Sequence, residues 1–155
     1  MFCLSQTSEY AILALACIAA NDNCRKKAHE ISACTGIPTP YLSKILHQLS
    51  RSDLVNGKRG TTGGFALTLP PEQIDLLRVA RAMEGEELMP ACLLGLAEHA
   101  DGGACPTCEF WDDVSQRIRS GLSGVSILDV AKFTHERFVH CLVSCIPENK
   151  KEDVD

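Results

Sequence analysis

The sequence lacks long apolar runs. Residues 11–20, the longest run near the N-terminus, are fewer than the roughly 20 residues that a membrane-spanning helix needs. A secretory signal would have Lys or Arg before its apolar run, and none precedes this one. Internal repeats and low-complexity tracts are also missing. We therefore expect no membrane association, a cytoplasmic location, and one compact domain or a small domain with a dimerising appendage.

Catalytic patterns are missing as well. No nucleophile–base pairing, phosphate-binding loop or carboxylate dyad is found, so we expect no enzyme activity. The net charge of −5, taken as a whole, argues against a nucleic-acid partner. Its distribution reverses that argument. Residues 25–68 hold seven Lys and Arg against two acids, a net charge of +5, whereas residues 69–155 hold eight against sixteen.

This basic segment includes a predicted helix followed by a glycine-tipped hairpin, over residues 38–69. Thr39 is the expected N-cap and Pro40 the expected first helical residue. Strand-forming residues at 54–55 and 65–67 flank a basic, glycine-rich turn over 58–64. The helical spacing predicts a buried face of Tyr41, Leu42, Ile45, Leu46 and Leu49 and an exposed face of Ser43, Lys44, His47, Gln48 and Arg51.

The segment before this helix completes a helix-turn-helix. Residues 28–34 predict a short helix, and Gly36 lies in the three-residue link that follows it. A first helix over 5–20, capped by Ser5, and a short helix that ends near Gly85 complete the unit. The fold is therefore predicted to be mainly α with a small β-hairpin, with a winged helix-turn-helix domain over residues 1–84. The alternative is ordinary helix packing beside a hairpin that is only a turn.

Such a domain presents one helix to the major groove and a hairpin, the wing, to the flanking minor groove. Double-stranded DNA is therefore the predicted partner. The predicted DNA-binding residues are Thr39, Tyr41, Ser43, Lys44, Gln48, Lys58, Arg59 and Thr61.

The remaining chain is divided into a cysteine-containing loop over 85–109, dimerisation helices over 110–133 and a tail over 134–155. A long C-terminal helix is predicted because Trp111, Val114, Ile118 and Leu122 recur with helical spacing. This apolar row can pack against a partner helix or against the winged domain of its own chain. We favour a homodimer, because DNA-binding domains of this kind usually work in two-fold pairs.

Three cysteines are candidate metal ligands. Cys105 and Cys108 form a C-x-x-C pair whose thiolates can converge on one metal, and Cys92 lies upstream in the same loop. Soft thiolates favour zinc or an iron–sulfur cluster, while a reversible disulfide is the alternative. His99 is either a solvent-exposed loop residue or a further ligand. The other cysteines are predicted to be small packing or surface residues: Cys3, Cys17, Cys24, Cys34, Cys141 and Cys145.

Several motifs in order resemble the Rrf2 family of bacterial transcription regulators over residues 1–133: LSQTSEYAILALACIA, YLSKILHQL, LVNGKRGTTGGFAL, IDLLRVARAMEG and the cysteine loop before Trp111. The resemblance implies a homodimer with long helices crossing between subunits. It also implies an iron–sulfur cluster, 2Fe-2S or 4Fe-4S, that biases DNA affinity. Cys92 and Cys105 match the first and last cluster cysteines. The family's middle cysteine is absent, so Cys108 or His99 would replace it, and Glu9 of the partner subunit could supply another ligand.

The function predicted from these observations is that of a sequence-specific transcriptional regulator, a homodimeric repressor sensing iron–sulfur status, redox state or nitric oxide. One alternative is a cluster-free or zinc-bound regulator controlled by a partner or by thiol oxidation. An alternative of another class is an iron–sulfur electron-transfer protein that retains a degenerate winged domain.

Overall fold

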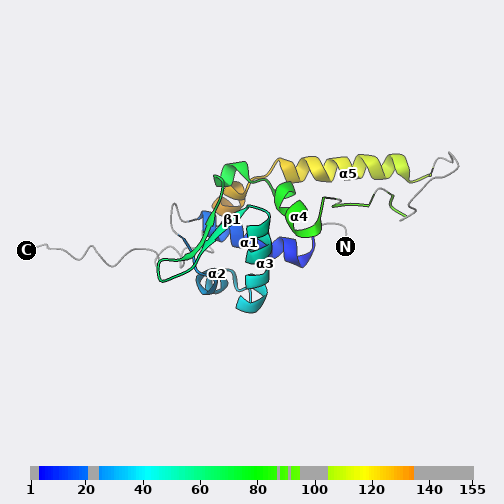
Figure 1. The fold of residues 1–155 in the computed structure, drawn as a ribbon. Coiled ribbons are helices and arrows are strands. Elements are labelled where there is room, and N and C mark those ends of the chain that lie inside the picture. The colour runs from blue at the N-terminus through cyan, green and yellow to red at the C-terminus, as the bar shows by residue number, and fades with distance from the viewer. Residues whose placement is uncertain (1–3, 21–24, 87, 91, 95–104, 135–155) are drawn as a thin grey trace, which may run out of the picture.

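The computed structural model describes residues 4–20, 25–86, 88–90, 92–94 and 105–134. Three helices form the body of the protein, α1 (Gln6–Ala19), α2 (Ala28–Thr35) and α3 (Thr39–Arg51). An antiparallel hairpin of β1 (Val55–Lys58) and β2 (Gly64–Leu67) follows, then η1 (Pro71–Gln73), α4 (Leu76–Glu84) and α5 (Cys108–Ser123). The order and packing confirm the predicted mainly α fold with a small hairpin (Figure 1). None of the described helices is both long and apolar enough to cross a membrane.

Helix α1 supplies the centre of the core. Ser5 is its N-cap, as predicted, and the Ser5 hydroxyl accepts a hydrogen bond from the backbone N–H of Ser8. Small residues on α1 allow the neighbouring helices to approach closely, and Ala11, Ala14 and Leu15 have no exposed surface. Helices α2, α3 and α4 each contact α1. The recognition elements are therefore built around one buried helix.

The link between α2 and α3 follows the predicted glycine turn. Gly36 has φ of 74°, a backbone conformation that side-chain-bearing residues rarely adopt, and its N–H donates to the carbonyl of Ser32 at 2.9 Å. The start of α3 differs from the prediction, because Pro38 and not Thr39 is the N-cap. Pro40 is accordingly the second helical residue. Its missing N–H has no cost at the first or the second helical position, because the N–H groups in the first turn of a helix have no intrahelical partner.

The wing comprises β1, β2 and their turn, residues 55–67. Its register pairs Val55 with Leu67 and Lys58 with Gly64. Lys26 joins the hairpin through an isolated antiparallel bridge to Phe65: its N–H donates to the Phe65 carbonyl at 3.0 Å and its carbonyl accepts from the Phe65 N–H at 2.7 Å. The side chain of Lys26 is buried against α1, where its Nζ donates to Cys17 Sγ at 3.5 Å. These contacts fix the root of the wing on the helical body.

Helix α5 packs on α4 and extends past the body of the protein (Figure 1). A further helical segment, residues 127–134, turns back onto the winged domain. Ile127 and Ala131 belong to the same hydrophobic core as α1 and α3, and the Ile127 N–H donates to the carbonyl of Ile74 at 2.8 Å. The second part of the predicted 110–133 unit therefore packs on the core of its own chain.

Candidate nucleic-acid interface and cysteine loop

The outer face of α3 is polar and exposed, as the spacing predicts. Four apolar side chains hold the inner face against the core, each with at most 2% of its surface exposed: Leu42, Ile45, Leu46 and Leu49. Thr39, Ser43 and Lys44 are exposed at the N-terminal half of the outer face. Ser43 donates its hydroxyl to the carbonyl of Thr39 at 2.8 Å and keeps its lone pairs available. This half of the helix can offer donors and positive charge to a groove.

The predicted burial of Tyr41 is wrong. Its side chain is 37% exposed, because it lies at the edge of the α1–α3 contact, where only one side is covered. The Tyr41 hydroxyl hydrogen-bonds the Thr7 hydroxyl at 2.8 Å, and its ring meets Tyr10 edge-on at 5.7 Å. Thr7 and Tyr10 thus hold an exposed ring at the start of α3. Sequence reasoning missed both of them, because their contacts join distant segments.

The predicted exposure of Gln48 is also wrong. Its side chain is half-buried, and its amide nitrogen donates to the carbonyls of Ala82 at 3.0 Å and Met83 at 3.1 Å. Both carbonyls belong to the last turn of α4. Gln48 therefore joins the recognition helix to α4, a contact that helical periodicity alone could not reveal.

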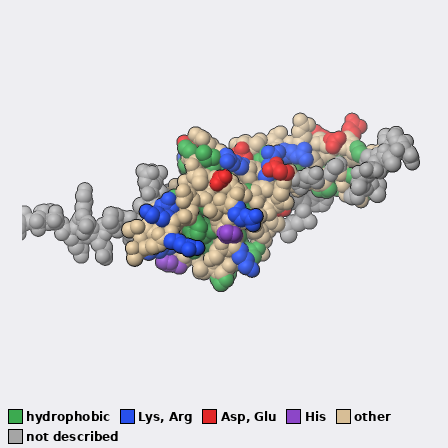
Figure 2. Space-filling view, in the orientation of Figure 1, with side chains coloured by type: hydrophobic (Ala, Val, Ile, Leu, Met, Phe, Trp, Pro, Cys, Tyr) green, Lys and Arg blue, Asp and Glu red, His purple; other side chains and the backbone are tan. Residues whose placement is uncertain are grey.

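The wing presents Lys58, Arg59 and Thr61 at its exposed tip. The root is held by Arg25, whose Nη1 donates to the carbonyls of Asn56 at 2.9 Å and Gly64 at 3.0 Å. Figure 2 shows basic side chains over the wing and the helix-turn-helix, basic and acidic side chains together near α4 and the adjoining part of α5, and acidic side chains at the far end of α5. On this face, the winged unit is therefore basic and the far end of α5 is acidic.

In the cysteine loop, the described thiols affect one another's pKa values. Cys92 is buried, with 6% of its surface exposed, while Cys105 and Cys108 are half-buried. Cys105 Sγ and the Thr107 hydroxyl share a hydrogen bond at 3.1 Å, which is the largest of the effects that lower the pKa of Cys105; Cys108 and Cys92 also lower it. Burial, followed by the effects of Cys105, Cys92 and Asp112, raises the pKa of Cys108. One thiol of the group is thus favoured as the thiolate.

Trp111 anchors this loop to α5. Its ring is buried, and its indole N–H donates to the carbonyl of Pro90 at 2.7 Å, two residues before Cys92. Cys108 is the first residue of the same helix. Trp111 therefore ties the Cys92 side of the loop to the helix that carries Cys108, although these cysteines are sixteen residues apart in the sequence.

The donor chemistry of these cysteines fits a thiophilic metal or cluster, but in the described part of the chain no three His, Cys, Asp or Glu side chains are arranged to hold one metal ion. His99 lies outside the described residues. Glu9 is exposed on α1, where it can face another molecule. Ser8, next to it, is buried and donates its hydroxyl to Glu84 Oε1 at 2.8 Å.

The cysteines outside the loop are of two kinds where the structure describes them. Cys17 is fully buried in α1, which confirms its predicted packing role. Cys34, near the end of α2, packs against the edge of the hydrophobic core, as predicted, and is also disulfide-bonded, which the sequence did not indicate. Cys3, Cys24, Cys141 and Cys145 lie outside the described residues.

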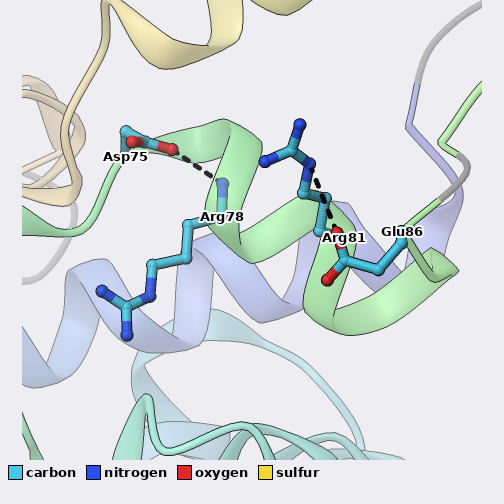
Figure 3. Close-up of polar contacts among 4 residues, drawn as sticks. All are labelled: Asp75, Arg78, Arg81 and Glu86. Atoms are coloured by element: carbon cyan, nitrogen blue, oxygen red, sulfur yellow. Dashed lines mark hydrogen bonds and ion pairs between the residues drawn. The ribbon is translucent and has the colours of Figure 1, made fainter.

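A groove of about 660 Å³, which sequence reasoning did not anticipate, lies between α4 and the turn after α3. Figure 3 shows four of the residues that line it, Arg78 and Arg81 of α4 with Asp75 before and Glu86 after the helix. Asp75 caps the helix by accepting from the Arg78 N–H at 2.7 Å, and Arg81 Nε approaches Glu86 at 3.9 Å. The guanidinium groups of Arg78 and Arg81 point to different sides of α4 in this view. They do not converge on a shared anion.

Comparison with known proteins identifies the family to which this chain is related. The sequence profile of the Rrf2 family, described as iron-dependent transcriptional regulators, matches residues 4–132. The chain belongs to the Rrf2 family. This Rrf2 protein is 31% identical over 129 residues to an HTH-type regulator of Aquifex aeolicus, covering 81% of this chain and 89% of that protein. It is 35% identical over 99 residues to the HTH-type transcriptional regulator IscR of Aliivibrio salmonicida, covering 63% of this chain and 58% of that one.

Solved Rrf2-type structures share the fold. CymR, the global cysteine regulator of B. subtilis, superposes with a TM-score of 0.72 at 20% identity, covering 86% of this chain and 99% of that one. IscR of T. potens superposes with a TM-score of 0.70 at 20% identity, covering 94% of this chain and 93% of that one. This Rrf2 protein is thus a DNA-binding transcriptional regulator of the HTH type, and its family is one of regulators, not of enzymes.

Proposed function

We propose that this Rrf2 protein binds a specific operator as a homodimer, with the outer face of α3 in the major groove and the wing in the flanking minor groove. The observation that carries the proposal is the exposed polar and basic face shared by α3 and the wing. The major-groove contacts are assigned to Thr39, Tyr41, Ser43 and Lys44. The wing contacts are assigned to Lys58, Arg59 and Thr61, whereas Gln48 is engaged with α4.

Electrostatics supports the same orientation. Phosphate neutralisation by Lys and Arg supplies most of the non-specific affinity for DNA, and the cations of residues 25–68 include Lys44 on α3 and the two wing-tip residues. The acidic far end of α5 would be repelled by the duplex. The winged face is therefore the face that approaches DNA.

The Arg59→Ala substitution is expected to weaken operator binding by about 1 to 3 kcal/mol if Arg59 enters a groove, because it removes an exposed cation at the tip of the wing. If Arg59 touches one phosphate, the salt dependence of log K should flatten by roughly 1. Fluorescence anisotropy over a salt series with an operator selected from genomic fragments measures both. Arg78→Ala, the same change at an exposed position on α4, serves as the matched control. Equal affinities for wild type and Arg59→Ala would remove the wing from the interface.

We propose further that the cysteine loop is the regulatory site. Cys92, Cys105 and Cys108 would supply thiolate ligands to an iron–sulfur cluster, 2Fe-2S or 4Fe-4S, with His99 or the partner's Glu9 as a further ligand. A bound cluster supplies chemistry that responds to iron supply, oxidation or nitric oxide. The support lies in three soft donors that already influence one another and in the tether between Trp111 and Pro90. The regulator would then act as a repressor whose DNA affinity follows the state of the loop.

A second candidate is a cluster-free or zinc-bound regulator controlled by a partner or by thiol oxidation. The lowered pKa of Cys105 favours it, because a thiolate is the reactive form of cysteine. The structural likeness to CymR, named as a cysteine regulator, is compatible with this reading. Metal analysis of the purified protein distinguishes the two candidates.

Dimerisation is assigned to α5. Val114, Ile118 and Leu122 form an apolar row that is only half-buried within the chain. The Ile118→Arg substitution is expected to shift the protein to monomer, because it places a charge in the middle of that row. Sedimentation velocity at micromolar concentration measures the change. Gln116→Arg, on an exposed face of the same helix, should remain dimeric. A dimer that persists in Ile118→Arg would exclude α5 as the interface.

A further inference from the structure

The last turn of α4 is fastened to the recognition helix by one side chain. Gln48, in the C-terminal half of α3, donates its amide nitrogen to the carbonyls of Ala82 at 3.0 Å and Met83 at 3.1 Å. Carbonyls in the last turn of a helix have no intrahelical partner and need one from elsewhere. Gln48 therefore caps α4 from a neighbouring helix, so a displacement of this turn moves the acceptors of a side chain on α3.

The same turn is fastened to α1 by Glu84. Its Oε1 accepts from the Ser5 N–H at 2.7 Å and from the Ser8 hydroxyl at 2.8 Å. Burial disfavours the charged form of Glu84, but the hydrogen bonds from Ser5 and Ser8 outweigh it and lower its pKa. The carboxylate also lies at the N-terminus of α1, where the helix dipole favours negative charge. Consecutive residues of α4 thus hold two different helices.

The cysteine loop begins directly after these contacts. Gly85 ends α4, and the described residues that follow lead through Pro90 to the buried Cys92. Pro90 is itself bound by Trp111 of α5. The segment between Gly85 and Pro90 is thus fixed at one end by the last turn of α4 and at the other by Trp111. A rearrangement around Cys92 therefore moves this segment and, through it, the last turn of α4. The DNA-facing start of α3 is held separately, through Tyr41 and Thr7.

We infer that Gln48 is a positioning residue that couples the state of the cysteine loop to the orientation of the recognition helix, with Glu84 holding the same turn of α4 against α1. The inference rests on the proposed function, since it names the route by which the loop changes DNA affinity. It assigns Gln48 a role other than base contact. Both of its donor hydrogens have acceptors inside the protein, whereas a residue that reads a base needs them free in the groove.

The test uses full-length Gln48→Leu, which is similar in size but cannot donate, and Gln48→Glu, which keeps the shape and loses the donor. Gln73→Leu, the same change at an exposed residue of η1, is the matched control. Each protein is prepared metal-free with reduced thiols and, separately, reconstituted anaerobically with iron and sulfide. The ratio of the two operator Kd values measures the coupling. We expect a wild-type ratio of at least about 5 and a ratio below about 2 for both Gln48 variants.

Amide hydrogen exchange of residues 45–51 gives a second readout that needs no DNA. In wild type and Gln73→Leu, protection of these amides should differ between the metal-free and reconstituted states, and in the Gln48 variants that difference should disappear. A Gln48 variant that keeps both the wild-type ratio and the exchange difference would overturn the inference. So would a wild type that binds its operator equally in both states with unchanged exchange. Failure of the wild type to bind any DNA would instead overturn the proposed function, leaving the exchange comparison to decide the coupling.

Discussion

Replacing Cys92, Cys105 and Cys108 together by Ala is expected to abolish the visible absorbance and the bound iron of the anaerobically reconstituted protein. These residues supply the soft donors of the cysteine loop, and their described thiols influence one another. Absorption spectra with iron, sulfide and zinc counts, taken on wild type and variant prepared side by side, measure the loss. The effect should be complete, because the remaining His99 and Glu9 cannot replace three thiolates.

The double variant Cys141→Ala, Cys145→Ala is the control for this experiment. It removes two cysteines from the tail and should leave the spectrum unchanged. A colourless wild type that holds one zinc ion would favour a structural zinc site. A wild type without metal, whose DNA affinity follows thiol oxidation, would favour the cluster-free regulator. Wild-type absorbance retained in the triple variant would exclude the cysteine loop as the cluster site.

Substituting Gly64 by Ala is expected to lower the free energy of unfolding by about 2 to 4 kcal/mol and to abolish specific DNA binding. Gly64 has φ of 135°, and a Cβ there would lie 2.8 Å from the backbone carbonyl of Lys26. The contact is with backbone, so a side-chain rotation cannot relieve it. The wing must shift away from the residue that joins it to the body. Urea unfolding followed by circular dichroism gives the stability, and anisotropy gives the DNA affinity.

Gly121→Ala is the matched comparison for Gly64→Ala. Gly121 lies within α5, and a Cβ added there meets no atom within 4 Å. Alanine has the higher helix propensity, so this change should leave stability unchanged or raise it by up to about 1 kcal/mol. Equal urea midpoints for the two variants would show that Gly64 imposes no constraint on the wing.

The sequence was sufficient to predict the elements that local chemistry specifies. The Ser5 cap, the Gly36 turn and the glycine-rich hairpin were all located correctly, because each depends on a residue type with a strong conformational preference. Leu42, Ile45, Leu46 and Leu49 were predicted as the inner face of α3 and are buried. The start of α3 was misplaced by one residue, because Thr39, a residue type that favours the N-cap, is already helical, and Pro38 is the N-cap without a side-chain hydrogen bond.

Contacts between distant segments could not be predicted in this way. Periodicity assigned Tyr41 to the core and Gln48 to solvent, but the partners that decide their positions, Thr7 and Met83, are far away in the sequence. The packing of residues 127–134 on the winged core was missed for the same reason. The candidate site was predicted as a set of residue types. Its internal connections, through Glu84, Gln48 and Trp111, required the fold.

The attachment of the wing has a consequence for how the protein meets DNA. The backbone of Lys26 is hydrogen-bonded to Phe65 of the hairpin, and its side-chain amino group lies in the interior beside Cys17. Moving the hairpin away from the body would break the two main-chain hydrogen bonds between Lys26 and Phe65, and because Lys26 is buried, the backbone groups left without partners would cost free energy. The hairpin is therefore not expected to move independently of the helical body. Because its conformation is set before DNA binds, little conformational entropy is lost when it docks. Discrimination among DNA sequences by the wing then depends on the side chains at its tip.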